Sequence, residues 1–397
     1  MLLNKGPEAQ PEPLAERVQQ LIGNRTTVQL FEHLGGFTAR LNRQEISSLK
    51  ASGMVLAIAD DDRTMSLEAA GRKKRGRKKK KKKKSTGDQN SLTRISAIDS
   101  GGSESSSSDI LPWGTKLVLG NRDPSSMIER ARSKYVFVMD TGISSTTGDL
   151  NVRTEWGYNF ISPGSSAEDD NGHGTHLAGT IGALANNIGI VGIAPGVNLI
   201  PYKVLDKNGS GSLSTVVAAI NRMLDTIASQ QLNPRDVVVN LSFGTRGQDP
   251  IIQAAISKAA ALGVRFAIAA GNYGNDVDGG DGSSPFIPAS YGNAQAGVFV
   301  TSAINSSLQM AGFSNYDRIS NPGDIDNIGF AAPGENILSW HRRADGSFGL
   351  FYLSGSSMAA AHLSGLLLLG EISAGPMASA NGAIAPDPIA MLAAAPI

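Results

Sequence analysis

The chain has 397 residues and no cysteine, so disulfides, thiolate catalysis and cysteine-based zinc sites are excluded. Its formal net charge of +1 hides an asymmetry, because twelve of the 36 lysines and arginines fall between Arg72 and Lys84. The rest of the chain has 24 basic and 35 acidic residues, a charge of about −11, which gives no reason to expect nucleic-acid binding.

Residues 1–68 are expected to form a small α+β unit. Within residues 14–68, the apolar pattern predicts strands at Thr27–Phe31, Gly36–Leu41 and Met54–Ala59 and a helix at Arg43–Ala51.

Residues 69–108 are expected to form a linker. The Arg72–Lys84 run repels its own charges, and the Gly-, Ser- and Glu-rich stretch Ser100–Ser108 cannot form a core. A solvated spacer is the simplest interpretation. Two others stay open, a tether to a polyanion or membrane surface and a processing site for another protease at Arg72–Arg75.

From Leu111 onward, predicted strands and helices alternate, which indicates a parallel sheet with helices on both faces. The predicted strands are Tyr135–Met139, Leu199–Leu205, Val237–Leu241, Arg265–Ala270 and Val298–Ala303. Helices are predicted from His173, at Leu213–Ala228, at Pro250–Leu262 and from Ser357, and the tail Pro388–Ala395 is expected to be the last helix.

Three polar residues lie at the ends of predicted elements. Asp140 follows a buried apolar strand, at the carboxyl edge where active sites gather in open α/β sheets. His173 begins a small-residue helix, which suits a rigidly held general base. Ser357 begins another helix, where backbone N–H groups point at a developing oxyanion.

The segments that carry these residues resemble a known family. Asp140-Thr141-Gly142, Gly172-His173-Gly174-Thr175-His176 and Gly355-Ser356-Ser357-Met358-Ala359 resemble, in this order, the signature segments of the subtilisin-like serine proteases (subtilases). The resemblance covers nearly everything from about Asp109 to the end. It implies an α/β, three-layer subtilisin-like fold with a mainly parallel sheet, and a catalytic domain over residues 109–397.

The resemblance also implies a serine endopeptidase that forms an acyl-enzyme. Ser357 would be the nucleophile, His173 its general base, and Asp140 the residue that fixes the imidazole. Asn272 would supply a side-chain N–H to the oxyanion. His176 lies in the same motif, but it sits about a turn further along the helix, and the family assigns catalysis to the first histidine.

Two segments match those with which the family pairs an extended substrate. Their residues are Gly209, Ser210 and Gly211 in one segment and Ser242, Phe243 and Gly244 in the other. Phe286 aligns near the base of the pocket for the residue before the cut, which implies a shallow pocket that favours smaller side chains.

Structural calcium is the cofactor that the resemblance implies. The implied ligands are backbone oxygens of Leu184, Ile188 and Ile190, the side chain of Asn186, and the carboxylates of Asp149 and Asp109. An all-oxygen set of this kind suits calcium. A second acidic loop, Asn275–Asp281, is expected to be a solvated turn.

The segment Gly35–Leu41, with the following helix and strand, resembles the inhibitory propeptide of subtilases; a separate partner-binding module is the alternative. The family's first propeptide strand has no visible counterpart, so an abbreviated propeptide is expected. The final cut is expected within Ser105–Asp109, where the residues are small and exposed. A mature start near Met65–Gly71 would instead favour the surface-tether interpretation.

Other functions remain open at this point. Ala361 stands where the family usually has proline, which keeps a peptide ligase or transpeptidase in view. A catalytically silent binding protein and a polyanion-binding protein are further alternatives. The expected partners are protein or peptide substrates and the chain's own propeptide, with the protein a monomer.

An extracytoplasmic location is expected, although Met1–Pro13 lacks the apolar core of a signal peptide. The run Leu366–Leu369 is far too short to span a membrane.

Overall fold

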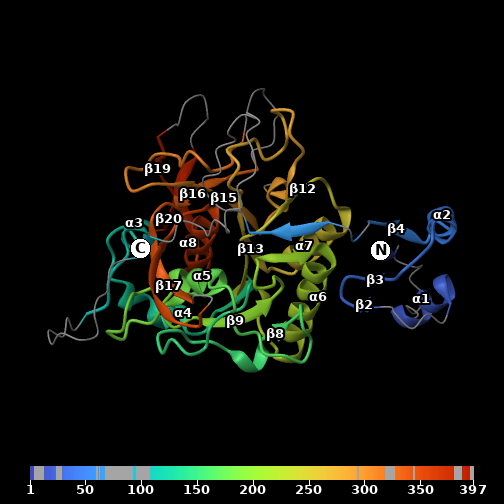
Figure 1. Cartoon of the computed structure of the whole chain (residues 1–397), viewed down its shortest axis with the longest axis horizontal. Helices are drawn as coiled ribbons and strands as arrows, with labels where there is room; N and C mark the ends of the chain where they lie inside the picture. The colour runs from blue at the N-terminus through green and yellow to red at the C-terminus, as the bar shows by residue number, and fades with distance from the viewer. Residues whose placement is uncertain are drawn as a thin grey trace, which may run out of the picture.

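A nine-stranded sheet runs through the larger part of the molecule, in the order β19-β20-β16-β15-β13-β11-β7-β9-β8 (Figure 1). The computed structural model describes residues 1–3, 13–23, 29–59, 61, 63–67, 93–94, 108–292, 295–317, 327–342, 345–379 and 387–393. The strands of this sheet are β7 (Tyr135–Asp140), β8 (Tyr158–Asn159), β9 (Asn198–Lys203), β11 (Val237–Leu241), β13 (Arg265–Ala269), β15 (Val298–Ile304), β16 (Phe330–Pro333), β19 (Ile372–Met377) and β20 (Pro388–Leu392). Neighbours pair in parallel except β19, which pairs antiparallel with β20 at one edge.

Helices cover both faces of this sheet, which gives the three layers that the sequence predicts (Figure 1). They are α3 (Trp113–Val118), α4 (Ile128–Ala131), α5 (His173–Gly182), α6 (Leu213–Ser229), α7 (Pro250–Ala261) and α8 (Ser356–Leu369), with short 3-10 turns at Pro124–Met127, Thr154–Trp156, Pro234–Asp236 and Ala289–Tyr291. Alternate residues of β7 point to opposite layers. Phe137 packs with α6 and α7, whereas Val138 packs with α5 and α8. The α/β class and the predicted strands and helices before Ser357 are therefore confirmed, with ends shifted by at most three residues.

Two expectations for the C-terminal part are wrong. The tail predicted as a helix forms strand β20, in which Ile389 and Ala390 are fully buried against the sheet. Its alanine-rich composition favours a helix, but pairing with β16 and β19 overrides that local preference. The sequence pattern also missed the hairpin of β17 (Ile337–Arg342) and β18 (Phe348–Leu353), to which β6 (Thr93–Arg94) adds a third strand.

The N-terminal unit is an antiparallel sheet in the order β2-β3-β1-β4 with two helices. Its elements are β1 (Leu2–Leu3), α1 (Leu14–Ile22), β2 (Gln29–Phe31), β3 (Gly36–Thr38), α2 (Arg43–Ala51) and β4 (Val55–Ala57). Leu2 pairs with both Gly36 and Ala57, so β1 joins this sheet. The sequence pattern does not predict β1, because a two-residue strand is too short to show periodicity.

The N-terminal unit packs against α6 and α7, at the right of Figure 1. Phe31 and Leu34 join the apolar cluster of these helices. Asp61 Oδ1 accepts from the Ser214 backbone N–H at 3.0 Å, in the first turn of α6. Shortly after Asp61 the chain forms β5 (Thr64–Ser66), which enters the candidate site.

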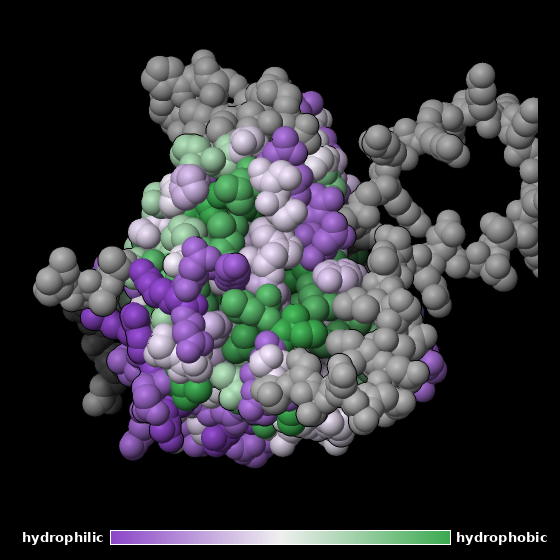
Figure 2. Space-filling view, turned by 90° about the vertical axis from the view of Figure 1, so that its left-hand side faces the viewer, coloured by the Kyte–Doolittle hydropathy of each residue, from purple (hydrophilic) through white to green (hydrophobic). Residues whose placement is uncertain are grey.

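On the face that lies at the left in Figure 1, apolar side chains gather near the middle and polar ones border them (Figure 2). Among the residues that the structure describes, no helix is long and apolar enough to cross a bilayer.

Candidate functional site

Asp140 ends β7 in the middle of the sheet, and its side chain is fully buried. Its Oδ1 lies 2.8 Å from His173 Nδ1 and accepts the Thr141 backbone N–H at 2.8 Å. Two donors therefore converge on one carboxylate oxygen. This geometry holds the imidazole of His173 in one orientation.

His173 is the first residue of α5, and its side chain is 14% exposed. Gly172 before it has φ of 109°, and a Cβ at that position would lie 2.1 Å from the Arg342 carbonyl oxygen. Only glycine suits this turn, which directs the histidine toward β7. Asn171 Oδ1 accepts the His173 N–H at 3.1 Å and caps the same end.

Asp169 is a buried residue of this site that the sequence reasoning missed. Its Oδ1 accepts the Gly172 N–H (2.8 Å) and the Thr141 hydroxyl (2.8 Å), and its Oδ2 accepts the Thr175 N–H (2.9 Å). One carboxylate therefore links the end of β7 to the start of α5. An aspartate two residues before an Asn-Gly turn was the available signal.

Ser357 lies in the first turn of α8 and is 5% exposed. Its Oγ donates to the Ser242 carbonyl oxygen at 3.2 Å, and Ser242 Oγ donates back to the Ser357 carbonyl at 3.3 Å. The helix start and the Ser242 segment are thereby held together.

Asn272 follows β13, and its amide is oriented by its neighbours. Its Oδ1 accepts the Ser356 N–H at 2.8 Å. A Cβ built on Gly355 would lie 3.3 Å from Asn272 Nδ2 and 3.7 Å from the Ser357 backbone nitrogen. Two N–H donors therefore border the same small space beside Ser357, as an oxyanion site requires.

His176 does not belong to this cluster. It is fully buried, and its Nε2 lies 3.0 Å from the Ile337 carbonyl and 3.1 Å from the Phe351 carbonyl. Burial, with His341 nearby, lowers the pKa of His176 to about 3. A neutral histidine bonded to β17 and β18 is a packing residue, which leaves His173 to face Asp140.

The two predicted substrate segments flank β5 of the N-terminal unit. β5 pairs antiparallel with β10 (Ser210–Ser212), with Gly211 opposite Met65. On its other side Ser66 and Gly244 exchange backbone hydrogen bonds of 3.2 and 3.4 Å. The chain thus places its own extended segment between the segments predicted to hold a substrate.

The Phe286 ring lies beside one of the segments predicted to hold a substrate. It lies in β14 (Phe286–Ile287), which pairs with β12 (Thr245–Arg246). A Cβ on Gly244 would lie 2.2 Å from its ring, and one on Gly271 would lie 2.8 Å from it. Both glycines therefore pack against this ring, between the Ser242–Gly244 segment and Asn272.

Asp149 and Asp109 come together at the loop after α5. Ile110 pairs with Ile190, which brings Asp109 to this loop. Asp109 Oδ1 and Asp149 Oδ1 are both buried without a hydrogen-bond partner, whereas Asp149 Oδ2 accepts the Trp340 indole N–H at 2.6 Å. Burial raises the pKa of Asp149 to about 6, against the opposing effect of the Trp340 bond.

The other predicted ligands lie in the same loop. Asn187 has φ of 65° and Gly189 has φ of 79°, which turn the backbone of residues 184–190. The side-chain oxygen of Asn186 accepts the Ile188 N–H at 3.0 Å. Two orphaned carboxylate oxygens beside a turned backbone fit a hard divalent cation.

The second acidic loop forms a separate cluster. Carboxylate oxygens of Asp276, Asp278 and Asp317 lie within 4.8 Å of one another. Burial, together with Asp317 and Asp276, raises the pKa of Asp278 to about 6. The Asn327 side chain donates to both Asp278 oxygens, at 2.9 and 2.8 Å. Asp276 is buried in this loop, whereas Asp278 and Asp281 are exposed, as expected of a solvated turn.

Comparison with known proteins gives consistent matches. Residues 132–372 match the subtilase family. The chain is 34% identical over 271 residues to a thermostable alkaline protease of Halalkalibacterium halodurans, a match covering 66% of this chain and 63% of that one. It is 36% identical over 234 residues to minor extracellular protease Epr of Bacillus subtilis, covering 59% of this chain and 31% of that one. It is 34% identical over 259 residues to subtilisin Savinase of Lederbergia lenta, covering 65% and 83%.

A solved structure is similar as well. The crystal structure of a cold adapted subtilisin-like serine proteinase matches with a TM-score of 0.55 and 26% identity, covering 72% of this chain and 98% of that one. The chain spans less than two thirds of the length of the first two relatives named above.

Proposed function

Because this chain belongs to the subtilase family, we propose that it is a serine endopeptidase that uses Ser357, His173 and Asp140. The observation that carries the proposal is the 2.8 Å contact of His173 Nδ1 with the buried Asp140. This contact lies at the carboxyl ends of the strands, on the same side of the sheet as Ser357 and Asn272. Relatives named as proteases support it.

The proposed reaction passes through an acyl-enzyme. Ser357 Oγ attacks the scissile carbonyl carbon while His173 Nε2 takes the hydroxyl proton, and His173 then gives that proton to the leaving amine. Asp140 accepts from Nδ1–H and stabilises the imidazolium. The Ser357 N–H and the Asn272 side chain stabilise the oxyanion. Water, activated by His173, hydrolyses the ester and restores the free hydroxyl.

Labelling by a fluorophosphonate probe, together with casein digestion, tests this proposal. We expect one stoichiometric adduct on Ser357 and release of casein peptides. A folded protein that is neither labelled nor able to cleave casein would instead be the catalytically silent binding protein. Ala361 is fully buried within α8, and the relatives named above are proteases. Hydrolysis is therefore proposed over peptide ligation.

We further propose that residues 1–68 are an inhibitory propeptide and that the chain is made as a zymogen. β5 supports this proposal, because a strand between β10 and Gly244 blocks the site for other chains. Met65 is fully buried in the apolar cluster around α6, which holds β5 in this position. The basic linker would join this unit to the catalytic domain, residues 109–397.

Calcium at the loop after α5 is also a proposal, supported by the orphaned oxygens of Asp109 and Asp149. The backbone oxygens of Leu184, Ile188 and Ile190 and the side chain of Asn186 would complete the shell. Asn186 would have to share the oxygen that accepts from Ile188. When bound, the ion would cross-link the start of the catalytic domain to the loop that follows α5.

Removing calcium is expected to lower the melting temperature by about 5–10 °C, if wild type starts at a concentration about 100-fold above its Kd. Differential scanning calorimetry in calcium and in excess chelator measures the shift, and Asp149→Ala should abolish most of it. Asp278→Asn is the matched control, because it removes a carboxylate from the separate cluster. A calcium response lost in Asp278→Asn but kept in Asp149→Ala would contradict the assignment.

An extracytoplasmic location is proposed because relatives such as the B. subtilis protease are named as extracellular. The proposed partners are protein substrates and the chain's own N-terminal unit, with the enzyme a monomer.

A further inference from the structure

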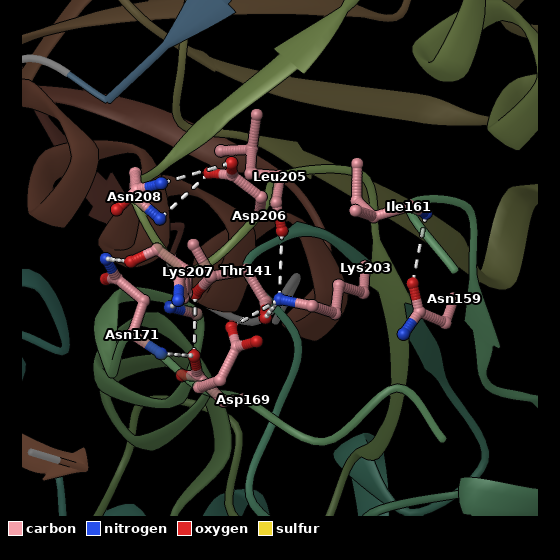
Figure 3. Close-up of polar contacts among 12 residues, drawn as sticks. Thr141, Asn159, Ile161, Asp169, Asn171, Lys203, Leu205, Asp206, Lys207 and Asn208 are labelled. Carbon is pink, nitrogen blue, oxygen red and sulfur yellow. Dashed lines mark hydrogen bonds and ion pairs between the residues drawn. The ribbon is translucent and has the colours of Figure 1, made fainter. Parts of the chain in front are cut away.

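Lys203, the last residue of β9, is only 3% exposed, yet its amino group has three acceptors. Nζ donates to the carbonyl oxygens of Thr141 (2.6 Å) and Leu205 (3.0 Å) and to Asp170 Oδ1 (2.6 Å) (Figure 3). A buried amino group is costly unless such bonds compensate its loss of water. What it bonds to therefore indicates what it does.

We propose that Lys203 is a positioning residue that fixes the Asp140 carboxylate against His173. The proposal rests on the proposed peptidase function. Asp140 and Lys203 are direct partners in the pairing of β7 with β9, so their side chains leave the sheet on the same face. Lys203 is thus the residue of the neighbouring strand that lies beside Asp140.

The first link runs through Thr141. Lys203 Nζ donates to the Thr141 carbonyl oxygen, while the Thr141 N–H donates to Asp140 Oδ1 at 2.8 Å. A residue bonded at both its carbonyl and its N–H cannot rotate freely. Without Lys203, the Thr141 carbonyl oxygen would lose this donor while the Thr141 hydroxyl stays bonded to Asp169, so the Thr141 N–H and the Asp140 oxygen it contacts would be less tightly fixed.

The second link runs through Asp170, which lies three residues before His173. Its neighbour Asp169 accepts from Thr141 Oγ1 at 2.8 Å (Figure 3) and from the Gly172 N–H, also at 2.8 Å. Lys203 therefore ties together the segment that follows Asp140 and the segment that precedes His173. Neither predicted substrate segment is among its partners.

This placement predicts an effect on the chemical step and not on substrate binding. In Lys203→Met we expect kcat to fall on the order of 10²-fold with KM unchanged, because a small misplacement of catalytic groups costs about that much. Lys134→Met is the matched control: it removes a half-buried lysine, paired with Asp236, just before the other end of β7. It should retain the wild-type kcat.

The absence of cysteine permits a rescue. Lys203→Cys has a single thiol, which can be aminoethylated in the unfolded chain to restore an amino group at the same reach. We expect low kcat before modification and recovery after refolding. The downfield NMR resonance of the His173 Nδ1 proton should shift in Lys203→Met and return in the aminoethylated protein, which reports on the contact with Asp140 independently of turnover.

The outcomes separate this proposal from the peptidase assignment. Wild-type protein that no fluorophosphonate labels would contradict the assignment itself. Active wild type with unchanged kcat and an unchanged Nδ1 proton in Lys203→Met would overturn only the role of Lys203. Failure of both Lys203 variants to fold would also overturn it, in favour of a purely structural lysine.

Discussion

Ser357→Ala is expected to lower proteolysis on the order of 10⁶-fold, because it removes the proposed nucleophile. The fold should survive, since Ser357 Oγ makes one 3.2 Å bond and alanine is a good helix residue. Initial rates with a fluorogenic peptide measure the loss, with calorimetry as the check on folding.

Asn272→Ala provides the comparison for this variant. It removes one of two oxyanion donors, so kcat should fall about 10²- to 10³-fold and leave measurable activity. The backbone N–H of Ser357 remains in place. Wild-type cleavage by Ser357→Ala would show that another group is the nucleophile and would refute the triad.

The second large effect concerns maturation, which is expected to be all or none. Ser66 pairs antiparallel with Gly244, and Ser242, two residues before Gly244, lies 3.2 Å from Ser357 Oγ through its carbonyl oxygen. If this antiparallel register is continued past Leu67, where the described segment ends, the residue two positions after Ser66 would stand opposite Ser242. We therefore predict the first cut after Glu68, which generates a species that begins at Ala69.

Mass spectrometry of the purified chain over time follows this cut. Wild type should lose residues 1–68, at a rate that does not depend on protein concentration because the bond is cut within the same chain. Ser357→Ala should stay intact. The final cut within Ser105–Asp109 stays a prediction as a later step. A chain cut there first, with no species starting at Ala69, would show that the β5 register is not used, and an uncut but fully active chain would refute the propeptide proposal.

The sequence predicts those residues of the candidate site that stand next to a recognisable end of a strand or helix. Asp140 follows an apolar run, and His173 and Ser357 begin apolar helices, so each stands at a visible boundary. The same holds for Asn272, which follows β13. That they gather at the carboxyl ends of the strands is expected for a parallel sheet covered by helices on both faces.

Other parts of the site depend on contacts between distant segments. Lys203 looks like the polar end of an apolar strand, yet its acceptors include Thr141 and Asp170, which are distant in the sequence. Asp169 is similar, because nothing local indicates that it bonds to Thr141. β17 was missed for the same reason. Its hydrogen bonds with His176 and with the Asp149 carboxylate form only when the hairpin is folded.

The position of β5 also has an electrostatic consequence. β5 ends before the basic run, so a cut after Glu68 leaves the lysines on the catalytic side. Residues 69–108 carry 13 basic and three acidic side chains, whereas residues 109–397 carry 16 basic and 23 acidic ones. The enzyme would therefore hold a net charge of +3 after the first cut and −7 after a cut just before Asp109. Its two processed forms would have opposite signs, so a cation exchanger would retain the first and release the second.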